Sequence, residues 1–251
     1  MKNKKITFLS KAVQSGAAFT IYIVFIAFVV IRASSNNFSI DLIFQYRSLL
    51  LEGMKNTLII SGYTLIFGMI LGFVLYVMQK SKVYFLKSMA NIFIEVMMGT
   101  PLIVLVFITS FFIGTAFGND DDYMLGIIAL TAYMGPYMAN IYKSVIESID
   151  KDQFVVMDLY GFSKYQRYRY IIMPQIIKPL MPPLMNNLSY IIKGSSLLYL
   201  TAVTEIFYSI KLIQSRTFAF TEGYLVLWLA YLVITIPLSL FTRYVQRRFA
   251  S

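Results

Sequence analysis

Cysteine and histidine are both absent from the 251 residues of this chain. Their absence excludes disulfides, zinc or iron sites built from Cys and His, and every mechanism that uses imidazole as a general base. Charged residues are scarce at 14%, whereas soluble domains carry about 25%. Hydrophobic residues make up 58% of the chain, and the mean hydropathy is +0.69. This composition predicts an integral membrane protein.

Two motif-level observations narrow the function further. The phosphate-binding pattern Gly-x-x-x-x-Gly-Lys-[Ser/Thr] is absent, and no glycine is followed by lysine, so the chain lacks the usual loop for binding ATP. The net charge of +10 would suit nucleic-acid binding in a soluble protein, but in a membrane chain positive charge sets orientation instead. We therefore expect a lipid membrane as the surroundings and no nucleic acid as a partner.

Six apolar runs are candidate membrane-spanning helices, and they cover residues 17–31, 57–78, 92–117, 123–142, 184–203 and 224–241. About 20 apolar residues cross a bilayer core of ~30 Å, so this length holds six spans and short loops. A signal peptide is the competing interpretation of the first run. We prefer an uncleaved helix, because no Ala-x-Ala signal occurs near residues 32–37. The prediction is an all-α membrane protein of about six helices.

Lysine and arginine are concentrated in alternate links, which sets the orientation. Sixteen of the 22 fall on one side: Lys2, Lys4, Lys5, Lys11, Lys80, Lys82, Lys87, Lys143, Lys151, Lys164, Arg167, Arg169, Lys178, Arg243, Arg247 and Arg248. The acidic residues 120–122 fall on the other side. We therefore expect both termini and the long loop 143–178 to be cytoplasmic. In the second run, Gly68 and Gly72 form a Gly-x-x-x-Gly pair that permits close helix packing.

The long cytoplasmic loop carries start and stop signals for two short helices. Asp150 with Gln153 has the spacing of a capping box, and Ser163 with Gln166 is its standard form. Gly161 between them suits a left-handed helix end. Pro174 is expected to stop the second helix. The loop is therefore predicted to be a bent helix pair.

The first of these helices is apolar around nearly its whole circumference: Phe154, Val155, Val156, Met157, Leu159 and Tyr160. A free cytosolic helix would not have this pattern. Either the helix packs beneath the membrane helices, or it inserts into a partner protein, since a contiguous exposed apolar patch usually marks an interaction site. Composition leaves both interpretations open.

This loop resembles the coupling loop of ATP-binding-cassette (ABC) importer permeases, whose pattern is Glu-Ala-Ala, a later Gly, then Ile-x-Leu-Pro. Gly161 followed by Ile171-Ile172-Met173-Pro174 matches the second half, with Met for Leu. Val155-Val156-Met157 stand where Glu-Ala-Ala is expected. Four further segments resemble the polar amino-acid branch: Gly53-Met54-Lys55-Asn56-Thr57-Leu58, Gly99-Thr100-Pro101-Leu102, Tyr137-Met138-Ala139-Asn140 and Lys193-Gly194-Ser195-Ser196-Leu197. The resemblance runs in order from residue 51 to residue 249.

The resemblance implies a type I importer permease with a five-helix core in residues 46–251 and a coupling loop at about 146–178. Residues 1–45 would add a basic cytoplasmic segment, an extra helix and an external linker. The chain would be no enzyme itself, and would hold no cofactor, because ATP and Mg bind the partner ATPase subunit. The other implied partners are a second permease, identical or homologous, and an extracytoplasmic substrate-binding protein. The location implied is the bacterial plasma membrane.

The resemblance also assigns candidate residues. The residues expected to contact the ATPase are Gln153, Val155, Val156, Met157, Asp158, Gly161, Ile171, Met173 and Pro174. The residues expected to line the substrate path or gate are Thr100, Pro101, Asn186, Asn187, Lys193, Ser195, Ser196 and Glu205. Each has a structural alternative: Thr100 and Pro101 as a helix kink, Lys193 and Glu205 as an ion pair, and the remaining four as interhelical hydrogen bonds.

Two other function classes compete with the importer permease. An ion-coupled secondary transporter or channel needs acidic residues within the membrane and usually an internal repeat. The spans offer Glu95 as the main acidic candidate, and no clear repeat is visible. A membrane protease without His or Cys would need a Ser-Lys or Asp pair, and no convincing pair occurs. The sequence therefore favours the importer permease.

Overall fold

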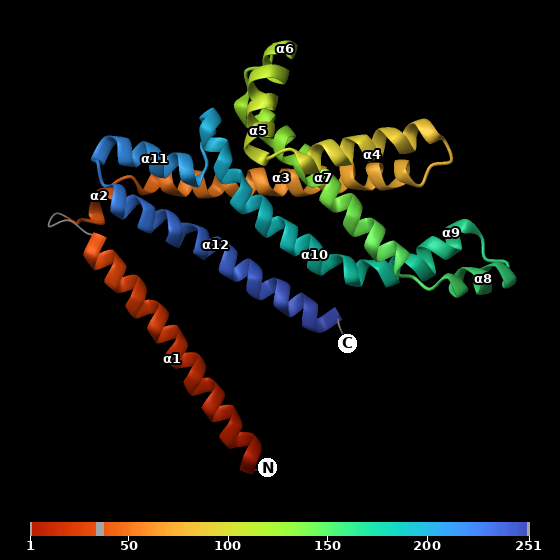
Figure 1. The fold of residues 1–251 in the computed structure, drawn as a ribbon, viewed down its shortest axis with the longest axis horizontal. Helices are drawn as coiled ribbons and strands as arrows, with labels where there is room; N and C mark the ends of the chain where they lie inside the picture. The colour runs from red at the N-terminus through yellow and green to blue at the C-terminus, as the bar shows by residue number, and fades with distance from the viewer. Residues whose placement is uncertain (1, 34–37, 250–251) are drawn as a thin grey trace.

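The computed structural model describes residues 2–33 and 38–249, and within them every regular element is helical. The elements in chain order are α1 (Lys2–Ala33), α2 (Asp41–Phe44), α3 (Arg47–Gln79), α4 (Tyr84–Gly99), α5 (Leu102–Phe107), η1 (Ile108–Gly114), α6 (Thr115–Phe117), α7 (Asp122–Glu147), α8 (Lys151–Leu159), α9 (Lys164–Gln166), η2 (Arg167–Ile172), α10 (Met173–Gly194), η3 (Ser195–Thr201), α11 (Ile206–Thr217) and α12 (Phe220–Phe249). Figure 1 shows their arrangement.

The described helices supply up to five of the six spans that the sequence predicts. Three of them, α3, α7 and α12, are each long and apolar enough to cross a membrane. Two bent pairs raise that number to five: α4 with the helical run Leu102–Phe117, and the run Lys164–Thr201 with α11. Within α1, Gly16–Arg32 forms a shorter apolar helix. The all-α, multi-pass membrane fold is therefore confirmed.

Close packing of α3 against α7 forms the centre of the molecule (Figure 1). A Cβ atom added at Gly72 would lie 2.9 Å from both the Ala139 nitrogen and the Gly135 oxygen of α7. At Gly68 it would meet Met134 Cβ at 3.5 Å. The glycine pair thus lets the two backbones approach closely, as the sequence predicts.

The run at 92–117, expected to be one span with an interruption, is two helical pieces bent by 111°. The chain is extended at Thr100 and Pro101, with ψ values of 126° and 139°. Proline disfavours helical geometry in the residue before it and lacks an N–H group. The Thr100 hydroxyl donates to the Val96 carbonyl at 2.6 Å. The segment therefore turns sharply instead of crossing as a straight helix.

Pro174 does not stop a helix, which corrects the prediction for the second half of the loop. Helical structure continues from Lys164 through η2 and α10 into η3, and Pro174 occupies the first turn of α10. In a first turn its missing N–H has no obligatory partner, and η2 is wound as a π-helix immediately before it. The helix that carries the fifth apolar run thus begins well before residue 184. The stretch between the fifth and sixth apolar runs forms α11.

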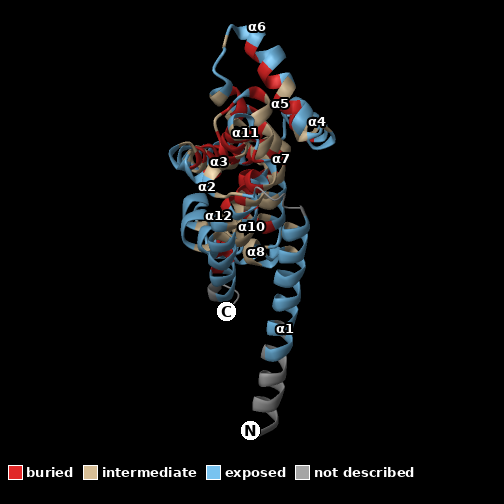
Figure 2. Cartoon of the chain, turned by 90° about the vertical axis from the view of Figure 1, so that its left-hand side faces the viewer, coloured by how far each residue is buried: buried red, intermediate tan, exposed pale blue. Residues whose placement is uncertain are grey.

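Helix α1 lies apart from the remaining helices in both views (Figures 1 and 2), and its described side chains are almost all exposed. The chain after it is tied to α12, because the Ser39 backbone N–H donates to Glu222 Oε1 at 3.0 Å. Residues 34–37 of the expected linker lie outside the described part. The division at residue 45 stays a prediction.

Candidate functional site

The loop between α7 and α10 positions α8 by caps at both ends. The Asp150 carboxylate accepts from the Asp152 N–H at 2.9 Å, so Asp150 caps the helix without the expected capping box. Gln153 instead accepts a bond from Gln175 of α10 at 3.0 Å. At the other end Gly161 is left-handed, with φ of 67°, and its N–H donates to the Asp158 carbonyl at 3.0 Å. The predicted left-handed helix end at Gly161 is confirmed.

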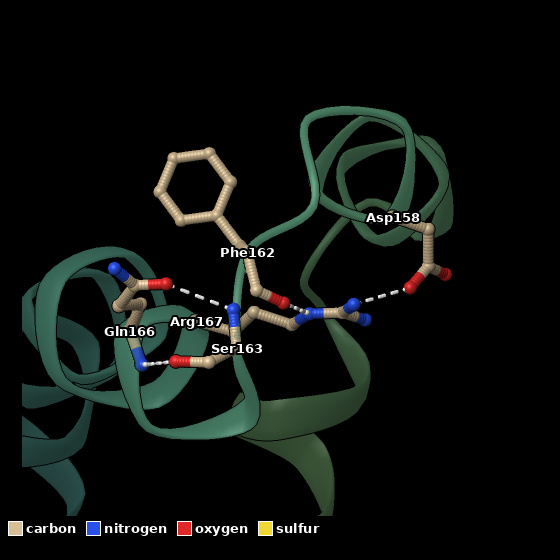
Figure 3. A network of polar contacts seen from close by, with 5 residues as sticks. All are labelled: Asp158, Phe162, Ser163, Gln166 and Arg167. Carbon is tan, nitrogen blue, oxygen red and sulfur yellow. Dashed lines mark hydrogen bonds and ion pairs between the residues drawn. The ribbon is translucent and has the colours of Figure 1, made fainter.

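The turn between α8 and α9 is braced by side chains (Figure 3). The capping box predicted for Ser163 and Gln166 is present, since each side chain accepts a bond from the other residue's backbone N–H. Arg167 spans the turn: its Nε donates to the Phe162 carbonyl at 2.8 Å, and its guanidinium pairs with Asp158. These bonds hold α8 at a defined angle to the helix that leads into α10.

The side chains of α8 differ in burial. Both interpretations that the sequence left open therefore apply: part of the helix packs beneath the membrane helices, and part is exposed. Met157 is 3% exposed and packs with Val145, Ile172 and Ile176. Four other apolar side chains, in α8 and at its C-terminal cap, are exposed and form the α8 tip: Val155 at 57%, Val156 at 49%, Leu159 at 81% and Tyr160 at 78% exposed. One face anchors the loop and the other remains available to a partner.

The remaining predicted contact residues are distributed over both faces. Asp158, Gly161, Met173 and Pro174 are exposed, whereas Gln153 and Ile171 are partly buried. Met157 is a buried anchor and contributes no surface. Leu159 and Tyr160 were missing from the predicted contact set, although their place on an apolar helix was a visible signal.

The ends of α3 and α7 nearest the loop are joined by the ion pair of Lys80 with Glu147. The side-chain hydrogen bond to Glu147 raises the pKa of Lys80. Gln79 also donates to Asn91 of α4 at 2.9 Å. These bonds tie three helices together where α7 passes into the loop.

The ion pair considered for Lys193 and Glu205 is not formed. Glu205 is fully buried, and its carboxylate accepts from the Tyr208 N–H at 2.7 Å and from the Tyr231 hydroxyl at 3.2 Å. Lys193 is exposed, with Nζ 5.5 Å from the centroid of the Tyr190 ring. Glu205 therefore fixes the joint between η3 and α11, and Lys193 remains available to another group.

The other predicted path residues divide into structural and open ones. Asn187 is buried, and its amide donates a hydrogen bond to Met138 Sδ at 3.5 Å. Ser195 is also buried, and its hydroxyl donates to the Ile192 carbonyl at 2.9 Å. Asn186 is exposed. Ser196 is partly buried, with its hydroxyl on the Lys193 carbonyl at 2.7 Å. Thr100 and Pro101 lie at the bend and line none of the cavities along α10.

Three cavities follow α10 from its outer to its inner end, inner meaning toward the loop. The outer cavity, about 320 Å³, is lined by Lys193, Ser196, Phe207, Tyr224, Leu227, Trp228 and Tyr231. The α7–α10 cavity, about 350 Å³, is lined by Tyr137, Asn140, Ile141, Ser144, Pro183, Asn186 and Asn187. The α10–α12 cavity, about 190 Å³, is lined by Met185, Asn186, Ser189, Ser239, Thr242, Arg243 and Gln246.

Two larger cavities, of about 440 and 780 Å³, have nearly all apolar linings, which makes them poor sites for a polar solute. The exposed polar groups Asn140, Ser144 and Asn186, by contrast, lie on helices that cross the membrane. Polar side chains at membrane depth face the interior of an assembly or water rather than lipid. The polar residues 186, 189, 193 and 196 recur at helical spacing, a signal that sequence reasoning did not use.

Comparison with known proteins agrees with this arrangement. Residues 64–251 match the family of binding-protein-dependent transport system inner membrane components. The chain is 30% identical to a probable glutamine ABC transporter permease protein, GlnM, of Bacillus subtilis, over 84% of this chain and 97% of that protein. It is 31% identical to the glutamine transport system permease protein GlnP of Escherichia coli, over 80% and 92% of the two chains.

Solved structures show the same fold. An amino acid ABC transporter crystallised with histidines aligns with a TM-score of 0.77 at 26% identity, covering 86% of this chain and all of that one. The MetNI methionine ABC transporter, at 16% identity and a TM-score of 0.60, shares the fold alone. With a braced loop that presents an apolar tip and a polar face along membrane helices, the chain belongs to the binding-protein-dependent transport system inner membrane component family, the permeases of ABC importers.

Proposed function

We propose that this chain is the permease subunit of an importer that moves amino acids across the bacterial plasma membrane, driven by ATP hydrolysis on a separate ATPase subunit. The observation that carries the proposal is the α8 tip, held out from the membrane helices on a braced loop. Its relatives in Bacillus subtilis and Escherichia coli are named as glutamine permeases, which supports amino acids as the substrate class.

The packing of the loop suggests how force reaches the membrane. Met157 ties α8 to Val145 of α7 and to Ile176 of α10, so these helices are displaced together when α8 moves. The glycine contacts with α3 and the ion pair of Lys80 extend the moving unit. In the proposed cycle the ATPase holds ATP and Mg, closes around them and pulls the α8 tip, and α7 and α10 respond as levers. Both termini lie in the cytoplasm.

The polar face of α7 and α10 would line the path together with a second permease. An external binding protein delivers the amino acid to the outer end, where the Lys193 ammonium group suits its α-carboxylate. Neutral amide and hydroxyl groups follow at Ser189 and Asn186 toward the loop. Such groups hold a zwitterion weakly, which permits release.

The test is purification of the complex from detergent with the tag on this chain, followed by an ATPase assay. Leu159→Arg places a charge on the α8 tip and should abolish both ATPase recovery and ATP-driven amino-acid uptake in vesicles. Tyr84→Arg is the matched control, because Tyr84 is 82% exposed at the first residue of α4 and is not part of the α8 tip. Recovery of the ATPase with Leu159→Arg, or loss with both variants, would contradict the docking role of the tip.

A further inference from the structure

The α10–α12 cavity has a lining unlike that of the other cavities. Six of its seven residues are polar or charged, and the seventh is Met185. Arg243 supplies the single formal charge in this lining. At about 190 Å³, the cavity has the size of a small polar molecule and is too narrow for a folded chain segment.

The Arg243 guanidinium has no carboxylate partner in the described part of the chain, where the ion pairs are Lys80 with Glu147 and Arg167 with Asp158. A guanidinium offers five N–H donors in a planar fork that matches a carboxylate. Thr242 is occupied by its own helix, since its hydroxyl donates to the Leu238 carbonyl at 2.8 Å. The cavity therefore presents an unpaired cation with its donors free.

Around this cation stand neutral groups that can accept and donate hydrogen bonds. They are the side chains of Asn186, Ser189, Ser239 and Gln246. Amide and hydroxyl oxygens accept bonds from an ammonium group, which Arg243 cannot do. A cation beside neutral acceptors is complementary to a zwitterion whose carboxylate and ammonium lie on one carbon.

The cavity also connects with the rest of the polar face. Asn186 lines both the α10–α12 cavity and the α7–α10 cavity. Ser189 lies one turn further toward Lys193 and Ser196 of the outer cavity. An amino acid moving along α10 from Lys193 past Ser189 would therefore reach Arg243, which lies in the last two turns of α12.

We propose that the α10–α12 cavity is a cytoplasmic-side subsite for a free amino acid, in which Arg243 binds the carboxylate and Asn186 and Gln246 accept from the ammonium group. The proposal rests on the proposed import function and adds an inner holding site to it. If the loop side is cytoplasmic, as the proposed function has it, amino acids already inside the cell would occupy the subsite as well.

The chain contains no cysteine, so a single introduced thiol reports on the cavity without background from this chain. Ser239→Cys is reconstituted with the partner ATPase in vesicles whose ATPase side faces outward, and N-ethylmaleimide labelling is followed on the band of this chain. A mixture of the twenty proteinogenic L-amino acids should slow labelling several-fold. Adding Arg243→Gln should remove that protection.

Matched variants separate the site from general effects. Arg247→Gln, one turn further along α12 and outside the cavity lining, should leave protection intact. Ser148→Cys, an exposed thiol at the end of α7, should be labelled at the same rate with and without amino acids. If Ser239→Cys fails to assemble with the ATPase, Ser189→Cys carries the same test.

Unchanged labelling in the presence of amino acids would overturn the subsite. So would labelling that slows in phosphatidylglycerol vesicles relative to phosphatidylcholine vesicles and ignores amino acids, because a lipid phosphate would then occupy Arg243. ATP-driven release of labelled amino acid from the lumen, loaded beforehand with the amino acid and its binding protein, is measured in the same vesicles and separates the two proposals. Release without protection refutes the subsite alone, and no release of any amino acid refutes the import function.

Discussion

Replacing Gly72 by alanine tests the close approach of α3 and α7, on which the proposed lever depends. The added Cβ would lie 2.9 Å from two backbone atoms of α7 and closer still to Met138 Cβ, whereas ordinary contact begins at 3.4 Å. Backbone atoms cannot rotate away as a side-chain end can, so the helices must separate by about half an ångström. Overpacking of this kind costs about 1–3 kcal/mol.

Gly62→Ala is the matched control on the same helix, because a Cβ there meets no atom within 4 Å. Both variants gain about 1 kcal/mol of helix propensity, so the difference between them isolates the clash. For a chain of this size the difference corresponds to melting temperatures roughly 2–12 °C apart. Thermal unfolding of the isolated chain in detergent measures it. Equal melting temperatures for the two variants would refute the reasoning.

Three further predictions follow from local geometry. Gly161→Ala and Gly118→Ala both place alanine in left-handed backbone with open space around it, which costs about 1–2 kcal/mol each. Only Gly161→Ala should reduce the ATPase activity of the complex. Equal activities of the two variants would contradict a special role for Gly161. Ser163→Ala removes one half of the capping box and should weaken binding of the ATPase in a titration, while the melting temperature stays within a few degrees of the wild-type value. Unaltered binding would show that the cap does not position α8. Tyr231→Phe removes one hydrogen-bond donor from the buried Glu205 carboxylate and should lower the free energy of unfolding by about 1–3 kcal/mol. A stability equal to that of the wild type would show that this hydrogen bond does not stabilise the fold.

The sequence by itself determined the membrane class, the number of apolar segments and the local signals of the loop. Apolar runs of span length are decided by the bilayer, so they are legible without tertiary information. The capping box at Ser163 and the left-handed Gly161 depend on neighbours within a few residues, and both were predicted correctly. The Gly68 and Gly72 pair was also readable, because small residues in a membrane helix mark a close contact.

Only the tertiary structure decided which residues meet across the fold. The partner of Glu205 is Tyr231, 26 positions away on α12, and spacing along the chain carries no signal for that contact. Pro174 lies inside continuous helical structure, directly after the π-helical η2, whose Ile172 packs with Met157 of α8. Likewise, Met157 was turned inward and Leu159 outward by the angle of α8, which Arg167 fixes through Asp158 and Phe162. Helical periodicity gives the faces of a helix, but the direction in which each face points depends on contacts distant in sequence.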